Sequence, residues 1–245
     1  MKKKINNKFY DDLGNDWYEK ENHPIALLRK ENNIRNPWIE SELEKHFPNK
    51  ALTLLDIGCG AGFLTNNLAK NHMVFGIDLS KESLEIAKSK APNSQVFYSV
   101  QNANSLRFED NTFDAVFAMD LLEHVNDADS VIKEVSRVLK PGGLFFFHTF
   151  NRNLLSYLLI IKGVDFFIPN SIKNMHVYHL FIKPKELIEK LKSSNIASKK
   201  IVGLSPKICS LGIFDLLFKR KITERFQFKI HKSLLTGYMG YGIKY

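Results

Sequence analysis

The chain has 245 residues, 44% of them hydrophobic and 25% charged, a composition typical of one substantial globular domain and not of a disordered or fibrous chain. No apolar run reaches the roughly 18 residues of a membrane-spanning helix, the basic start "MKKKINNKFY" leads into no secretory signal, and two cysteines suit a reduced, cytoplasmic protein. The net charge of +9 is uneven, because residues 1–150 hold 18 Lys+Arg against 21 Asp+Glu, whereas residues 151–245 hold 17 against 5.

Short apolar runs alternate with helical patterns through most of the chain. Continuously apolar runs predict strands that are buried on both faces of a parallel sheet, with helices covering it. The predicted strands cover residues 52–58, 73–79, 95–100, 113–119, 144–150, 199–205 and 236–245. The predicted helices cover residues 36–47 with Pro37 at the first position, 63–70, 80–90 with Ser80 as N-cap, 128–140 and 183–195, and residues 205–235 are expected to be irregular or helical.

The stretch "LLDIGCGAGFLTNNLAK" places Gly58, Gly60 and Gly62 between the first predicted strand and a helix. Such a turn presents backbone N–H groups at the carboxyl edge of the sheet, where open α/β sheets bind ligands. Asp78 follows Gly58 by 20 positions, at the end of the second strand, where an acid can accept hydrogen bonds from both ribose hydroxyls. The alternatives are a tight turn without a ligand, a dinucleotide site or an S-adenosylmethionine site.

Four segments in order resemble the motifs of class I S-adenosylmethionine-dependent methyltransferases: "LLDIGCGAG", "VFGIDLS", "FDAVFAMDLLEHV" and "EVSRVLKPGGLFFFHTFNRN". The resemblance implies an α/β, Rossmann-like fold whose mostly parallel, seven-stranded sheet has helices on both faces and an antiparallel last strand. It also implies an N-terminal helical lid in residues 1–50 and a methyltransferase domain in 51–245. Insertions that face the substrate or a membrane are expected in 151–180 and 205–235.

A closer resemblance, to the ubiquinone-biosynthesis O-methyltransferases, rests on "NNIRNPWI", "TFNRN" and "HLFIKPKEL". It implies methylation of a phenolic or catechol hydroxyl, with a polyprenylated quinone precursor as the acceptor. The residues from 196 onward match this pattern only loosely. Other readings remain open: a methyltransferase of another small molecule or of RNA, with nucleic acid less favoured, and a non-catalytic protein that binds the cofactor.

The resemblance assigns cofactor contacts along the whole N-terminal half. Asp56, Gly58 and Gly60 would hold the methionine part, Asp78 the ribose, and Arg35 the carboxylate, although Asp56 could instead cap a turn and Arg35 could be an ordinary surface residue. Met119 would contribute a backbone carbonyl. The adenine pocket would include Asn102, where the family usually has aspartate, and Ala103. An amide oxygen can still accept a hydrogen bond from the adenine amino group.

The segment "MDLLEHV" raises a further hypothesis. If a helix begins near Asp120, then Asp120, Glu123 and His124 share one face at i, i+3 and i+4. Some members of the family bind magnesium at the matching positions, and oxygen ligands suit that ion better than imidazole does. The alternative is that these residues shape the substrate pocket, with His124 as general base. His148, His176 and His179 are expected to be structural or to line the substrate pocket.

Residues 154–169, "LLSYLLIIKGVDFFIP", combine large apolar side chains with the basic C-terminal part. A polyprenylated acceptor would be dissolved in a membrane, so we expect peripheral contact with an anionic membrane surface on its inner, cytoplasmic face. The alternative is an ordinary core segment with solvated lysines.

Overall fold

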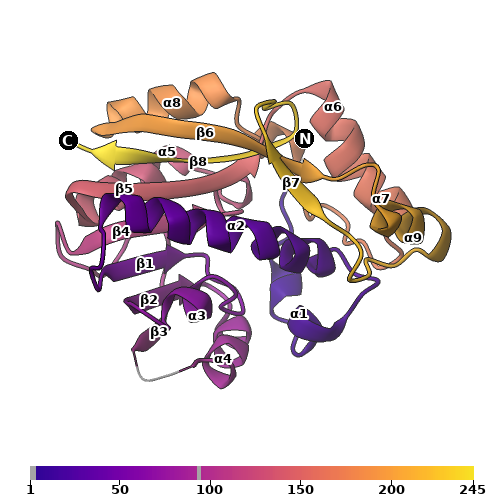
Figure 1. The fold of residues 1–245 in the computed structure, drawn as a ribbon, viewed down its shortest axis with the longest axis horizontal. Coiled ribbons are helices and arrows are strands. Elements are labelled where there is room, and N and C mark those ends of the chain that lie inside the picture. Colours follow the sequence, from indigo (N-terminus) through magenta and orange to yellow (C-terminus); the bar gives the residue numbers. More distant parts are fainter. Residues whose placement is uncertain (1–3, 93–94) are drawn as a thin grey trace.

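The computed structural model describes residues 4–92 and 95–245 (Figure 1). Its strands are β1 (Thr53–Ile57), β2 (Met73–Asp78), β3 (Val96–Val100), β4 (Phe113–Met119), β5 (Leu139–Phe150), β6 (Ile196–Pro206), β7 (Phe228–His231) and β8 (Gly237–Lys244). Its longer helices are α2 (Ile25–His46), α4 (Lys81–Ser89), α5 (Ala128–Val138), α8 (Pro184–Ser193) and α9 (Leu211–Lys219). The short helical elements are η1 (Lys8–Tyr10), α1 (Asp16–Glu19), α3 (Thr65–Leu68), η2 (Leu122–His124), α6 (Leu154–Ser156), the π-helical η3 (Tyr157–Gly163), α7 (Val164–Phe167) and η4 (Tyr178–Leu180).

The described strands form one sheet in the order β3-β2-β1-β4-β5-β8-β6-β7. The first five are parallel, and β8 runs antiparallel to both of its neighbours, β5 and β6. This confirms the predicted α/β fold with its antiparallel last strand. The sheet has eight strands where seven were expected, because β7 forms within residues 205–235 and pairs antiparallel with the end of β6.

Both faces of the central strand β4 are buried, as its largely apolar sequence predicts. All seven of its residues are buried, and Ala115 to Met119 alternate between two clusters. Val116 and Ala118 pack with α5 and α8 on one face, whereas Phe117 and Met119 pack with α2 and the residues around α3 on the other. Because successive side chains of a strand point to opposite faces of the sheet, a run of apolar residues can pack against helices on both faces.

The N-terminal helix differs from its prediction. Helix α2 begins at Ile25 and contains Pro37 in its interior, so the helix predicted to start at Pro37 was too short. An interior proline removes one helical hydrogen bond and disfavours the helix by about 3 kcal/mol relative to alanine. Burial of Ile39 and Leu43 against the sheet, together with Arg35 and Asn36 in buried polar contacts, offsets this cost. Helix α3 is also shorter than predicted.

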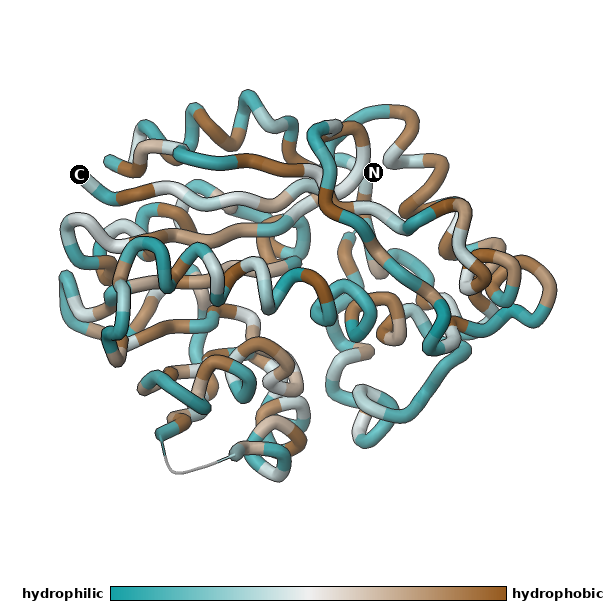
Figure 2. The backbone as a smooth tube through the Cα atoms, viewed as in Figure 1, coloured by the Kyte–Doolittle hydropathy of each residue, from teal (hydrophilic) through white to brown (hydrophobic). Residues whose placement is uncertain are grey.

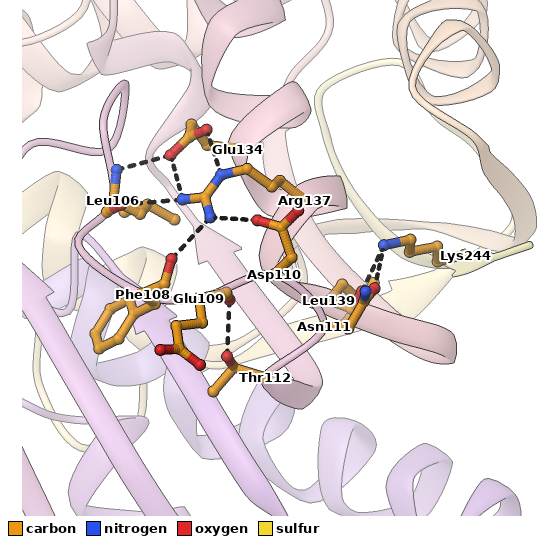
Figure 3. A network of polar contacts seen from close by, with 10 residues as sticks. All are labelled: Leu106, Phe108, Glu109, Asp110, Asn111, Thr112, Glu134, Arg137, Leu139 and Lys244. Atoms are coloured by element: carbon orange, nitrogen blue, oxygen red, sulfur yellow. Dashed lines mark hydrogen bonds and ion pairs between the residues drawn. The ribbon is translucent and has the colours of Figure 1, made fainter.

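A network centred on Arg137 fixes the loop between β3 and β4, which carries Asn102 and Ala103 (Figure 3). The Arg137 guanidinium donates to the backbone oxygens of Leu106 and Phe108 and to the carboxylates of Asp110 and Glu134 at distances between 2.7 and 3.0 Å. Five N–H donors in a rigid planar group can join several loop positions at once. Helix α5 thereby holds the loop at the edge of the sheet.

Four helical segments that follow β5, namely α6, η3, α7 and α9, lie close together at one end of the molecule (Figure 1). Arg220, directly after α9, donates to the Phe166 backbone oxygen in α7 at 2.7 Å. Hydrophobic positions colour much of these helices in Figure 2, and several large side chains on them are exposed. No helix in the part of the chain that the structure describes is long and apolar enough to cross a membrane.

Candidate active site

The turn after β1 forms the floor of the site. Gly58 and Gly60 both have positive φ angles, 71° and 51°, which favour glycine. A Cβ at Gly60 would lie 2.8 Å from the Trp17 ring, so glycine is also needed for that close contact. Asp78 at the end of β2 fastens the turn, because its carboxylate accepts from the backbone N–H groups of Gly60 and Ser80, each at 2.9 Å.

A cavity of about 660 Å³ opens above this turn at the carboxyl edge of the sheet. The structure brings every residue predicted to contact the cofactor into its lining: Arg35, Asp56, Gly58, Gly60, Asp78, Asn102, Ala103 and Met119. Asp120 and His124 also line it. A single cavity at this edge is where an open α/β sheet is expected to bind a nucleotide-like ligand.

The N-terminal residues close one side of this cavity, within the segment 1–50 where the family resemblance implies a lid. Tyr10 stacks on Trp17 with ring centroids 5.5 Å apart, and Trp17 Nε1 donates to Ser83 Oγ at 3.2 Å. The Asn7 amide makes two contacts with His124, one to its backbone oxygen at 3.0 Å and one to its ring Nδ1 at 3.1 Å. The segment before α2 is therefore bonded to both α4 and the turn η2 that follows β4.

A buried charged network lies beside the cavity. Asp120 accepts from Arg35 Nη1 at 2.5 Å and contacts His148 Nδ1 through its other oxygen. Arg35 also donates from Nη2 to Asn32 at 3.2 Å, and Glu31 lies 3.9 Å from Nη1. Burial alone would raise the pKa of Asp120, but Arg35 and His148 hold it well below its usual range. Arg35 Nε is buried without a partner among the described residues.

The helix predicted to begin at Asp120 does not form. Asp120 has a left-handed backbone with φ of 56°, and only the three-residue turn η2 follows. The i, i+3, i+4 argument therefore fails, because Asp120 turns toward Arg35 and His148. Asp120 stands with Glu31 and His148 in one cluster of potential metal ligands, whereas Glu123 and His124 stand with His176 in another.

Glu123 and His124 each have one side-chain atom in a hydrogen bond. Thr149 donates to Glu123 Oε2 at 2.7 Å, and Glu123 Oε1 is buried without a partner among the described residues. Burial, with the nearby charge of Asp120, raises the pKa of Glu123 to about 8. Burial lowers the pKa of His124 to about 4, only partly offset by Asp120. The His124 imidazole is therefore neutral near pH 7.

His176 comes from the loop before η4, far away in the sequence, and its ring lies 5.2 Å from that of His124. Burial and the neighbouring His124 lower the pKa of His176 to about 3. His176 also lines a second cavity of about 490 Å³, which residues of η3 and α7 border. Sequence spacing could not place this imidazole opposite His124. His179, in contrast, is exposed.

Comparisons with known proteins agree with this geometry. A family model described as a methyltransferase domain matches residues 55–147. A ubiquinone biosynthesis O-methyltransferase of Pelagibacter ubique is 34% identical, and the match covers 80% of this chain and 85% of that protein. A ubiquinone biosynthesis O-methyltransferase of Coxiella burnetii is also 34% identical, and the match covers 80% of this chain and 82% of that protein. The chain belongs to the family of ubiquinone biosynthesis O-methyltransferases.

Solved methyltransferases share the fold of this family member. An S-adenosylmethionine-dependent methyltransferase of Thermotoga maritima is similar with a TM-score of 0.66 and 16% identity, covering 97% of this chain and 99% of its own. Magnesium protoporphyrin IX methyltransferase of Synechocystis was solved with bound S-adenosylhomocysteine. Its TM-score is 0.66 with 16% identity, and the match covers 98% of this chain and 96% of that protein. This O-methyltransferase family member is thus an S-adenosylmethionine-dependent methyltransferase.

The cavity fits the cofactor on two observations. The unpartnered Nε of Arg35 offers a donor for a carboxylate, and Asp78 keeps lone pairs for hydroxyl groups. The individual contacts of Arg35, Asp56, Asp78, Asn102, Ala103 and Met119 with the cofactor stay predictions.

The first prediction concerns Asp56. Burial raises its pKa to about 7, although Thr65 donates to its carboxylate at 2.6 Å. The folded protein then binds a proton that the unfolded chain has lost above about pH 4, so the free energy of unfolding should fall with rising pH until about pH 7, by up to about 1.4 kcal/mol per pH unit. In Asp56→Asn, urea unfolding of the unliganded protein should depend less on pH over this range.

The exposed Asp12 provides the control for this measurement. Asp12→Asn should keep the parental pH dependence of unfolding. An Asp56→Asn profile that runs parallel to the parental one would show that Asp56 is not protonated in the folded state.

The second prediction concerns Asp120 as the residue that orients Arg35. Asp120→Asn should weaken binding of S-adenosylhomocysteine by about ten-fold or more, equal to about 1.4 kcal/mol, because Arg35 loses the anion that aligns it with the cofactor carboxylate. 5′-Methylthioadenosine lacks that carboxylate, so its affinity should stay unchanged. Calorimetric titration of both ligands measures the difference.

Asp129→Asn, a change in a half-exposed ion pair with Lys190, is the matched control and should bind both ligands as the parent does. Equal weakening of both ligands by Asp120→Asn would instead indicate a general distortion of the cavity.

Proposed function

We propose that this methyltransferase transfers the methyl group of S-adenosylmethionine to a phenolic or catechol hydroxyl on a polyprenylated ring, as the names of its relatives suggest. The observation that carries the proposal is the position of His124. This neutral imidazole lines the larger cavity and faces His176, which lines the second cavity. An acceptor entering from the second cavity would meet the methyl donor at this pair.

The protein's own contribution would be orientation and proton handling. Methyl transfer needs an in-line approach, and holding both reactants in place can supply about 7 to 11 kcal/mol of the barrier. When bound, the cofactor supplies an electrophilic methyl group. Asn7 engages His124 Nδ1, so Nε2 is the ring nitrogen that would accept the hydroxyl proton as the oxygen gains the methyl group.

The second cavity suits the acceptor by its walls. Tyr157, Ile160 and Ile161 from the π-helical η3 form one side, and the loop from Ile172 to His179 forms the other. An aromatic ring would find apolar and aromatic neighbours there, including Tyr178. Residues of η3 and α7 line this cavity, and the same two helices carry exposed apolar side chains, so a prenyl chain on the acceptor would lie close to the surface.

We extend the proposal to a membrane surface at the end of the molecule formed by α6, η3, α7 and α9. Large apolar side chains are exposed there, including Leu154, Leu158, Leu159 and Phe166 before β6, and Ile208, Leu211, Phe214 and Phe218 after it. Lys162, Lys207, Lys219, Arg220 and Lys221 lie among them in the sequence. An apolar face bordered by cations is suited to shallow insertion into an anionic membrane.

The third prediction tests the reaction. With S-adenosylmethionine and a short-chain prenylated catechol, the enzyme should form the methyl ether, and His124→Asn should reduce its rate by about 10² to 10⁴ while retaining S-adenosylhomocysteine binding. His46→Asn should keep the parental rate, because that imidazole is exposed at the end of α2 and lines neither cavity. RNA should accept no methyl groups. Absence of methylated catechol both with and without a chelator would contradict the proposal.

The fourth prediction tests the membrane surface. Binding to vesicles that contain phosphatidylglycerol should exceed binding to neutral vesicles and should weaken with salt. The double substitution Phe214→Ser and Phe218→Ser should reduce this binding by about ten-fold or more, since each phenylalanine buried in lipid contributes about 1.5 to 3 kcal/mol. Co-sedimentation with vesicles measures both effects.

The control for vesicle binding is Tyr245→Ser, which removes an exposed aromatic residue next to the C-terminal end of β8, away from α9 (Figure 1). It should bind vesicles as the parent does. Equal binding to neutral and anionic vesicles at low salt would count against the membrane surface.

A further inference from the structure

Two aromatic rings line the larger cavity between the glycine turn and His124. The Tyr10 ring stacks on the Trp17 ring with centroids 5.5 Å apart, and it meets the His124 ring in a T-shaped contact at 6.0 Å. Trp17 lies against the turn itself, because a Cβ at Gly60 would approach its ring to 2.8 Å. Both aromatic residues line the cavity. An aromatic wall therefore runs from the floor of the cavity to the imidazole proposed as the base.

Helix α4 holds this wall in place through one buried hydroxyl group. Ser83 Oγ accepts from Trp17 Nε1 at 3.2 Å and donates to the Tyr10 backbone oxygen at 3.0 Å. Phe9, directly before Tyr10, is buried in one cluster with Trp17 and Ala61. The fold therefore sets the position of the Tyr10 ring before any ligand binds, which lowers the entropic cost of using it for recognition.

The Tyr10 side chain lies near carboxylates from two strand ends. Burial, together with the charges of Asp120 and Asp78, raises the pKa of its hydroxyl above the ordinary value. Asp78 ends β2 and Asp120 follows β4, so the ring stands between two sources of negative charge. Such surroundings favour a positively charged group of a ligand.

The covalent structure of S-adenosylmethionine indicates which of its groups meets this wall. Its sulfur joins the ribose to the amino-acid part. The ribose is predicted to lie at Asp78, and the amino-acid carboxylate at Arg35, which Asp120 holds. With those two contacts, the sulfur falls between Asp78 and Arg35, beside the Tyr10 ring. This sulfur carries a positive charge in S-adenosylmethionine and none in S-adenosylhomocysteine.

We propose that Tyr10 is a specificity-determining residue whose ring, supported by Trp17, contacts the sulfonium group and distinguishes the charged methyl donor from the neutral product. The attraction of a cation to an aromatic face corresponds to about two-fold to thirty-fold in affinity. In the reaction the bond from sulfur to the methyl carbon breaks, and the sulfur keeps the electron pair and becomes neutral. The acceptor oxygen gains the methyl group and loses its proton. The ring contact then weakens, which favours exchange of the product for a new donor.

Calorimetric titration of the full chain with S-adenosylmethionine, and separately with S-adenosylhomocysteine, tests this contact without any acceptor. Tyr10→Leu should lower the ratio of the two association constants by about three-fold or more, because leucine has no ring with a negative face. Tyr10→Phe should keep the ratio within about two-fold of the parental value, because the ring remains. Tyr245→Leu makes the same change at an exposed position that lines neither cavity, and it should bind both ligands as the parent does.

A second variant decides the matter if Tyr10→Leu disturbs the N-terminal segment, which S-adenosylhomocysteine affinity and thermal unfolding would reveal. Tyr10→Phe with a fully fluorinated outer ring edge nearly keeps the shape of the ring but removes the negative charge of its face, so the ratio should fall as in Tyr10→Leu. The proposal is overturned if the fluorinated protein keeps the parental ratio, or if Tyr10→Phe alone lowers the ratio as far as Tyr10→Leu does. The titrations contain no acceptor, so either result leaves the catechol assay to decide the proposed function separately.

Discussion

The ion pair between Arg35 and Asp120 joins the two parts of the molecule on which the site depends. Arg35 belongs to the N-terminal helix α2, whereas Asp120 follows the central strand β4 and is held by His148 from β5. Two charges buried at this distance need each other, because removing either leaves the other uncompensated in a poorly solvated place. The pair therefore fixes the N-terminal segment over the carboxyl edge of the sheet, and this edge is where the cofactor cavity forms.

The same burial sets the chemistry of the neighbouring groups. Burial and the nearby charge of Asp120 raise the pKa of Glu123. Burial lowers the pKa of His124 and of His176, because a charged imidazole would be poorly solvated there, so both rings stay neutral. Neutral imidazoles can accept protons or hold a metal ion, and a positively charged one can do neither. The same burial thus prepares His124 for its proposed role as the base.

The alternating fold and the gathering of the glycine turn and Asp78 around one cavity could be predicted from the sequence, because those signals are local. The apolar strands, the glycine turn and Asp78 can each be recognised from a few neighbouring residues. In the structure the strands form one sheet, and the turn and Asp78 lie together at its carboxyl edge. What failed depended on tertiary contacts. Helix α2 continues through Pro37 because its buried face packs on the sheet, and Asp120 leaves helical geometry because distant partners hold it. His176 reaches His124 through a loop whose course no spacing rule encodes.

The amide of Asn7 links the closure of the cavity to the orientation of His124. It bonds to the backbone and the ring of His124 at once, so the residue that closes the cavity also sets the orientation of the imidazole. Asn7 also lines the cavity, so a displacement of this segment would open the cavity and break the hydrogen bond to the His124 ring together. The orientation of the imidazole thus depends on a segment 117 residues away in the sequence.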